Sequence, residues 1–147
     1  MKLIICGGGA RVSYLIGIKK FIEEKKIKIE EYAGSSSGSI FIVLMACGIS
    51  NKQIVKEYQL LIKDKEYSNN YKFDIIRKYL QKVLPENADK ICSNKVRISL
   101  SYFDFPFIKN KIVTNFKSKN HLIETILTSC CFPFFINKTY QKISFLI

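Results

Sequence analysis

The spacing of apolar and polar positions predicts strands and helices in the order of a parallel α/β sheet. Lys2–Cys6 is a short apolar run that stops at three glycines, which predicts a buried strand followed by a loop. From Ser13, apolar residues recur every three or four positions among lysines and glutamates, as in an amphipathic helix lying on a sheet. Residues 27–33 alternate as a second strand that Gly34 breaks. Residues 39–47 are apolar on every side, which predicts a helix buried in the core.

The middle of the chain predicts two more helices and a third strand. Apolar residues at helical spacing predict helices over 51–66 and 74–84, with a loop over 67–71 between them. Asp74 is expected to cap the second of these helices. Residues 95–103 alternate between apolar and polar side chains and predict the third strand.

The C-terminal third predicts an antiparallel pair and a final helix. Residues 107–116 predict a hairpin or strand pair that turns at Lys109-Asn110. Asn120 is expected to cap a helix that Pro133 ends. The βαβα order at the N-terminus favours an α/β fold with a mainly parallel central sheet and helices on both faces. A length of 147 residues predicts one domain over 1–147, because half the chain could not bury a sufficient core.

Composition and charge exclude several classes of protein. Apolar residues make up 48% and charged residues 24% of the chain, as in an ordinary globular protein. The formal net charge is +12, but 21 of the 24 basic residues are lysines scattered along the chain. Specific nucleic-acid contacts favour clustered arginine, so we interpret this charge as compositional drift and expect no specific nucleic-acid partner. The sequence leaves the oligomeric state open.

The cysteines and the apolar runs bear on metal binding and location. The five cysteines form no C-x-x-C pair and His121 is the one histidine, so we expect no metal site and no cofactor. This cysteine usage favours a reducing, cytoplasmic setting. The run Leu3–Cys6 is too short for a secretory signal, and the run 40–49 is about half of a membrane span. We therefore expect a chain that can touch a membrane surface without crossing it.

A G-x-S-x-G motif lies between the second predicted strand and the buried helix. It runs Gly34-Ser35-Ser36-Ser37-Gly38 and would place the Ser36 hydroxyl at the tip of a sharp turn. Gly34 and Gly38 are expected because side chains there would collide with neighbouring backbone. The Ser37 N–H and the dipole of the following helix could stabilise negative charge on a substrate oxygen. The alternative is a serine-rich turn of purely structural use.

A second glycine cluster, Gly7-Gly8-Gly9-Ala10-Arg11, also follows a strand and precedes a helix. It fails as a dinucleotide loop because the sixth motif position is Val12, and it lacks the G-K-[ST] of a phosphate-binding loop. As an oxyanion hole it is suitable, since glycines let backbone N–H groups approach a carbonyl oxygen. If both loops end adjacent parallel strands, Ser36 should lie within a few ångströms of the backbone of Gly7–Ala10.

Together these motifs resemble the patatin-like phospholipase family. The resemblance rests on the two glycine motifs and Gly17 within Leu3–Ala46, and on residues 128–135, which resemble the small-residue helix end that precedes the family's proline segment. It implies a three-layer patatin-like fold and a serine acyl hydrolase that acts on membrane or neutral lipids through a Ser–Asp dyad. Ser36 would be the nucleophile, and Arg11 would steady the oxyanion loop or a lipid head group.

The general base departs from this family pattern. The family's base lies in an Asp-Gly-Gly or Asp-Gly-Ala turn beyond the proline segment, and no aspartate follows Asp104 in this chain. We therefore expect a C-terminally incomplete domain with weak or no hydrolysis. Asp104 is the least implausible substitute for this base, and His121 keeps a formal Ser–Asp–His order available, but we assign neither residue as catalytic and expect His121 to be a solvated residue in the first turn of a helix. The alternative function is a non-catalytic interaction protein that keeps the fold.

Overall fold

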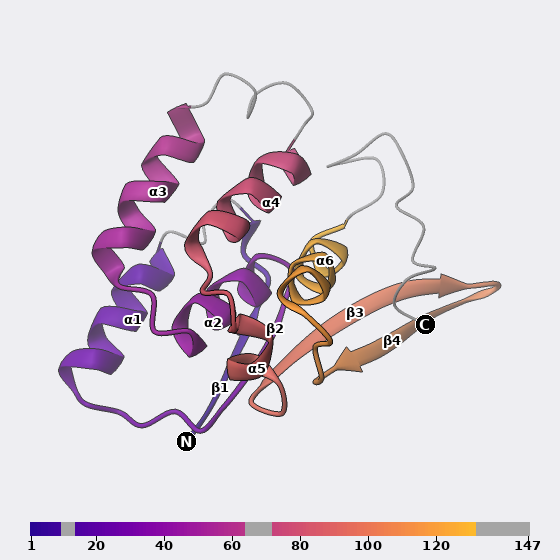
Figure 1. Ribbon diagram of the computed structural model, residues 1–147. Coiled ribbons are helices and arrows are strands. Elements are labelled where there is room, and N and C mark those ends of the chain that lie inside the picture. The colour runs from indigo at the N-terminus through magenta and orange to yellow at the C-terminus, as the bar shows by residue number, and fades with distance from the viewer. Residues whose placement is uncertain (10–13, 64–71, 132–147) are drawn as a thin grey trace.

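A computed structural model describes residues 1–9, 14–63 and 72–131, and shows helices packed on a twisted sheet (Figure 1). The strands are β1 (Lys2–Cys6), β2 (Glu31–Ser35), β3 (Val96–Asp104) and β4 (Phe107–Val113). The helices are α1 (Leu15–Glu24), α2 (Ser37–Ala46), α3 (Asn51–Lys63), α4 (Lys72–Val83), α5 (Ala88–Cys92) and α6 (Lys119–Ser129). The predicted α/β class is confirmed.

The sheet has the order β1-β2-β3-β4, and its first three strands are parallel. Ile5 pairs with Gly34, which pairs in turn with Ile98, so these three residues share one face of the sheet. β4 runs antiparallel to β3. The mainly parallel sheet predicted from the βαβα order is confirmed, and the carboxyl ends of β1 and β2 lie side by side at one edge.

The core lies between this face and the helices, with α2 at its centre. Phe41, Ile42, Val43 and Leu44 are each at most 2% exposed, because α2 lies against the sheet on one side and other helices on the other. α6 contributes Leu122, Ile126 and Leu127 to the same apolar cluster. Burial of this kind supplies the main free energy that holds such a fold together.

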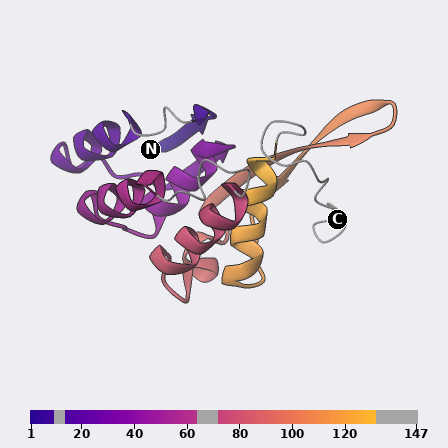
Figure 2. The same cartoon turned by 90° about the horizontal axis from the view of Figure 1, so that it is seen from above.

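The opposite face of the sheet is open within the described residues. Ile4 is 70% exposed there, and Arg97 forms an ion pair with Glu31 across neighbouring strands. Figure 2 shows the helices gathered on one side of the strands. The expected helices on both faces are therefore not found in this part of the chain. The strand order advances in one direction from β1 to β3, and right-handed crossovers then place every connecting helix on the same face.

The second strand begins four residues later than the alternation predicted. Ile27 and Ile29 are half-buried against the core, so the alternation reflects burial without strand pairing. β1 begins at Lys2 and pairs with Glu31, which leaves the residues before Glu31 without a neighbouring strand. Gly34 does not break this strand but lies inside β2.

The predicted turn at Lys109-Asn110 is also wrong, because both residues lie within β4. β3 and β4 are joined through Phe105-Pro106, and Asp104 pairs with Phe107 across that turn. A proline has no N–H to donate and fits a turn better than a paired strand position. The Asn110 amide instead donates to the Ser99 hydroxyl at 2.7 Å across the strand pair.

Two helix starts differ as well. Ser118, not Asn120, caps α6, and its hydroxyl accepts a hydrogen bond from the His121 N–H. Asp74 lies in the first turn of α4, where it forms an ion pair with Arg77. Over the described ranges, no helix has both the length and the apolar composition needed to cross a bilayer.

Candidate active site

Ser36 lies at the sharp junction between β2 and α2. Its backbone has φ 53° and ψ −135°, and a positive φ is sterically unfavourable for a residue with a side chain. The Ser36 carbonyl accepts hydrogen bonds from the Ser39 N–H at 2.8 Å and from the Ser39 hydroxyl at 2.6 Å. The turn is therefore held in a conformation that the free chain would avoid, as often occurs at functional sites.

The two glycines of the motif are required by close backbone contacts. A Cβ on Gly38 would lie 2.3 Å from the Ile5 carbonyl oxygen of β1. A Cβ on Gly34 would lie 2.9 Å from the Ile42 side chain and 3.0 Å from the Gly38 backbone. The close approach inferred from the motif thus has a geometric cause: α2 starts directly against the strands.

The first glycine loop lies next to the Ser36 turn. Gly7, Gly8 and Gly9 all have positive φ values, of 52°, 125° and 54°, which residues with side chains rarely adopt. The Gly7 N–H donates to the Ser35 carbonyl at 3.1 Å, so the two loops continue from paired strand ends. The predicted residues Ala10 and Arg11 lie outside the described residues.

The start of α2 presents polar groups to the glycine loop. Ser37 is the first residue of the helix, and the first N–H groups of a helix have no partner within it. The Ser37 hydroxyl is buried and has no hydrogen-bond partner among the described residues. A Cβ on Gly8 would lie 3.6 Å from that hydroxyl, which places the Ser37 side chain beside the loop.

Ser129, at the end of α6, links the Ser36 turn to strand β3 through hydrogen bonds. The Ser36 N–H donates to the Ser129 hydroxyl at 2.9 Å, and that hydroxyl donates to the Ser99 carbonyl of β3 at 2.7 Å. Sequence reasoning missed this role because the partners are 93 residues apart. The signal present in the sequence was a small polar residue at the end of an apolar helix.

Neither stand-in base lies near the Ser36 turn. Asp104 is at the far end of β3, about 17 Å along the strand from Ser99 at about 3.3 Å per residue. His121 is in the first turn of α6, about 12 Å along the helix from Ser129 at about 1.5 Å per residue. Among residues 1–9, 14–63 and 72–131, no carboxylate forms a hydrogen bond with the Ser36 turn.

His121 has a structural environment of its own. Its Nδ1 accepts a hydrogen bond from the Lys117 N–H at 3.2 Å. Partial burial and the nearby Lys117 ammonium lower the pKa of His121 from its ordinary value. A neutral imidazole that accepts a backbone hydrogen bond at a helix start contributes to the local fold, away from the Ser36 turn.

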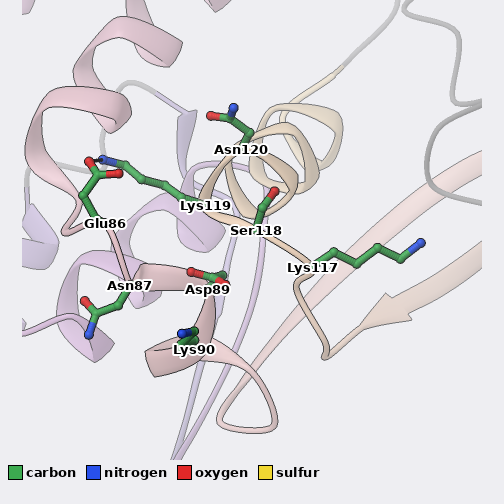
Figure 3. Close-up of a pocket in the computed structure, with 8 residues that line it drawn as sticks. All are labelled: Glu86, Asn87, Asp89, Lys90, Lys117, Ser118, Lys119 and Asn120. Carbon is green, nitrogen blue, oxygen red and sulfur yellow. Dashed lines mark hydrogen bonds and ion pairs between the residues drawn. The ribbon is translucent and has the colours of Figure 1, made fainter.

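A polar depression of about 510 Å³ lies at the start of α6, at the opposite end of that helix from Ser129 (Figure 3). Lys119 spans it and bonds the Glu86 carboxylate at 2.8 Å, as the dashed line shows. Its lining residues are Glu86, Asn87, Asp89, Lys90, Lys117, Ser118, Lys119 and Asn120. The depression is thus separate from the Ser36 turn.

Known proteins resemble this chain along most of its length. Human omega-hydroxyceramide transacylase is 26% identical over 125 residues, which cover 78% of this chain and 23% of that protein. The mouse transacylase is 30% identical over 120 residues, 75% of this chain and 20% of its own. The mouse 1-acylglycerol-3-phosphate O-acyltransferase is 30% identical over 112 residues, 71% of this chain and 26% of its own.

The chain thus spans about a fifth to a quarter of the length of these relatives. The family model for patatin-like phospholipases matches residues 3–143, which include both glycine loops, the Ser36 turn and α6. The family is one of lipid-modifying enzymes, and these relatives are a transacylase and an acyltransferase. The chain belongs to the patatin-like phospholipase family.

Proposed function

We propose that this chain performs acyl chemistry on lipid esters, with hydrolysis as its simplest form and Ser36 as the nucleophile. The observation that carries the proposal is the positive φ of Ser36 at the β2–α2 junction, beside three glycines that also have positive φ. Strain at a serine, next to backbone that can approach a substrate closely, is expected of a nucleophile site. Membrane or neutral lipids are the substrate class that the family suggests.

The geometry supports a two-step mechanism. The Ser36 Oγ would attack the ester carbonyl carbon while its proton passes to a base, and the carbonyl oxygen would become an oxyanion. Backbone N–H groups of Gly8, Gly9, Ala10 and Ser37 would stabilise that oxyanion, with Gly7 shaping the loop and Arg11 steadying it. The oxyanion would then collapse, and the base would return its proton to the departing alcohol. Water or another hydroxyl would next attack the acyl-Ser36 ester, give its proton to the base and take the acyl group, and the base would return that proton to the Ser36 Oγ.

The proton acceptor limits the expected rate. A serine hydroxyl is a weak nucleophile without a base, and the described residues place no carboxylate at the Ser36 turn. We therefore expect slow turnover from residues 1–147. An added C-terminal Asp-Gly-Gly segment of the kind that the family carries should raise it.

Turnover of a p-nitrophenyl ester tests this mechanism. The extended chain should hydrolyse the ester much faster than the chain itself. Ser36→Ala should then remove about 10³-fold or more of that rate, because the parts of such a site act as a unit. Ser101→Ala is the matched control, since Ser101 is exposed on β3, and it should have no effect.

Two results would contradict the mechanism. Turnover that Ser36→Ala leaves unchanged would remove Ser36 as the nucleophile. Fast turnover by the unextended chain, lost on Asp104→Asn or His121→Ala, would identify a different base.

The second candidate function is a non-catalytic interaction protein that keeps the fold. The observation in its favour is the same lack of a carboxylate at the Ser36 turn within the described residues. In that case the extended chain would hydrolyse no ester above background, and Ser36 would react with no phosphonylating reagent.

A further inference from the structure

The end of the β3–β4 pair projects from the body as an apolar arm. We define the arm as residues 101–112, which Figures 1 and 2 show extending away from the helices. Phe105 is 85% exposed, Phe107 67% and Ile108 78%, all at or next to the turn that joins the strands. Grouped apolar side chains in solvent are uncommon on a soluble monomer and mark a surface that contacts something apolar.

The strand register sorts the arm into two faces. Ile108 and Ile112 are four residues apart on β4, and side chains alternate between the two faces along a strand, so both isoleucines lie on the same face. Lys109 and Lys111 alternate with these isoleucines and therefore belong to the other face. The arm thus has an apolar tip, an exposed Ile112 farther along β4, and two ammonium groups from Lys109 and Lys111.

The arm itself carries a net positive charge. Within residues 101–112, Lys109 and Lys111 outnumber the one acidic residue, Asp104. This arrangement matches a lipid surface with anionic head groups. The ammonium groups would contact the head groups, and the exposed aromatic and aliphatic side chains would contact the apolar layer beneath them.

The arm also extends past the edge that carries the candidate nucleophile. Ser99 lies at the level of the Ser36 turn, since the Ser129 hydroxyl bonds both the Ser99 carbonyl and the Ser36 N–H. From Ser99 to Asp104, β3 continues for about 17 Å at about 3.3 Å per residue. The twist of the sheet carries this continuation away from the helices (Figure 1).

We propose that the arm docks this protein onto an anionic lipid surface, with Phe105, Phe107 and Ile108 entering the interfacial layer. Lys109 and Lys111 bind the head groups. The edge of the sheet with the Ser36 turn is thereby held near the surface that contains its substrate. The role given to docking, bringing Ser36 to its substrate, rests on the proposed function. The binding to lipid itself requires no catalysis.

Co-sedimentation of the full chain with vesicles tests the docking. Binding should be stronger to vesicles that contain phosphatidylserine than to phosphatidylcholine vesicles. The double substitution Phe107→Ser/Ile108→Ser should weaken binding about tenfold or more, because two large apolar side chains lose their contact with lipid. The matched control is Phe21→Ser, since Phe21 is 53% exposed on α1, and its binding should stay within about twofold.

A second pair of variants separates charge from apolar insertion. Lys109→Gln/Lys111→Gln should weaken binding to phosphatidylserine vesicles about tenfold or more and leave binding to phosphatidylcholine vesicles unchanged. Added salt should reproduce this loss for the unsubstituted chain.

The outcomes separate the docking from the proposed chemistry. Ser36→Ala should bind vesicles as the unsubstituted chain does, so failure of the mechanism leaves docking intact. The Phe107→Ser/Ile108→Ser variant should keep the unfolding midpoint of the unsubstituted chain, which shows that it still folds. No vesicle binding by the full chain, or binding that the arm substitutions leave unchanged, would overturn the proposal. Conversion of a dimer to a monomer by those substitutions, with vesicle binding retained, would instead assign the arm to a second copy of this chain.

Discussion

Helix α2 and the arm are both rich in large apolar residues, yet they have opposite environments. Phe41–Leu44 of α2 are at most 2% exposed, whereas Phe105 and Ile108 of the arm are 85% and 78% exposed. The helix starts at the Ser36 turn and is packed so tightly that Gly38 has no room for a side chain. The arm contacts solvent on both sides of its tip.

The difference shows that the same kind of residue serves two purposes here. In α2, apolar burial fixes the position of the Ser36 turn and supplies folding free energy. In the arm, apolar exposure supplies little folding free energy and leaves a surface that can bind. Substitutions in the body should therefore affect stability, and substitutions in the arm should affect binding.

The largest expected effect is the difference in unfolding free energy between a substitution in the body and one in the arm. Leu122→Ala in α6 should lower the free energy of unfolding by about 2–5 kcal/mol, because Leu122 is fully buried and its loss leaves a cavity. Ile108→Ala in the arm should change it by less than about 0.5 kcal/mol. Urea unfolding of both variants measures the difference. Equal losses would show that the arm is packed in solution.

The next effect concerns the contact between α2 and β1. Gly38→Ala should cost up to about 3 kcal/mol, because its Cβ would lie 2.3 Å from the Ile5 carbonyl oxygen and would push the helix away. The control is Gly17→Ala in α1, where a Cβ meets nothing within 4 Å and should stabilise the helix by about 0.5–1 kcal/mol. Urea midpoints of the two variants should therefore move in opposite directions, and a neutral Gly38→Ala would refute the close approach.

A smaller effect is expected where α6 supports the Ser36 turn. Ser129→Ala should cost about 1–2 kcal/mol, because the Ser36 N–H and the Ser99 carbonyl both lose their partner. Thr128→Ala is the neighbouring control. Among the described residues, the Thr128 hydroxyl bonds the Glu124 carbonyl of its own helix and nothing else, so its loss should cost less than about 0.5 kcal/mol. Comparable costs for the two variants would contradict a bridge through Ser129.

The smallest effect is a dependence of stability on pH through His121. Its lowered pKa means that the folded chain binds a proton more weakly than the unfolded chain does. The contribution of the neutral imidazole is complete above the ordinary histidine pKa of about 6.5 and is lost as the pH falls below it. The melting temperature should fall less between pH 8 and pH 5 in His121→Gln than in the unsubstituted chain. If the melting temperatures of both proteins changed with pH in parallel, His121 would make no contribution to the pH dependence of stability.

The local sequence predicted features that depend on near neighbours. The order of elements from β1 to α4, the buried α2 and the glycine contacts at Gly34 and Gly38 follow from short patterns in the chain, whereas the short α5 was not predicted. The start of β2 could not be predicted, because it depends on where β1 begins to pair with it. The turn at Phe105-Pro106 was not predicted, because the polar residues Lys109 and Asn110 were interpreted as the turn. Their side chains are polar because they are exposed on a paired strand.

The part of the site that depends on distant residues could not be predicted. Ser129 reaches Ser36 only because α6 packs against β3 and α2. The open face of the sheet depends on the direction in which the strand order advances, which no local pattern records. The exposure of the arm likewise depends on how far β3 and β4 extend past their neighbours.

The central claim is that the strained serine of the turn is the reactive nucleophile. The most direct measurement is prolonged treatment of the full chain with a fluorophosphonate, followed by mass spectrometry of its peptides. The proposed mechanism predicts an adduct on Ser36, which Ser36→Ala abolishes and Ser101→Ala leaves intact. An adduct on another serine, or labelling that Ser36→Ala leaves unchanged, would contradict it.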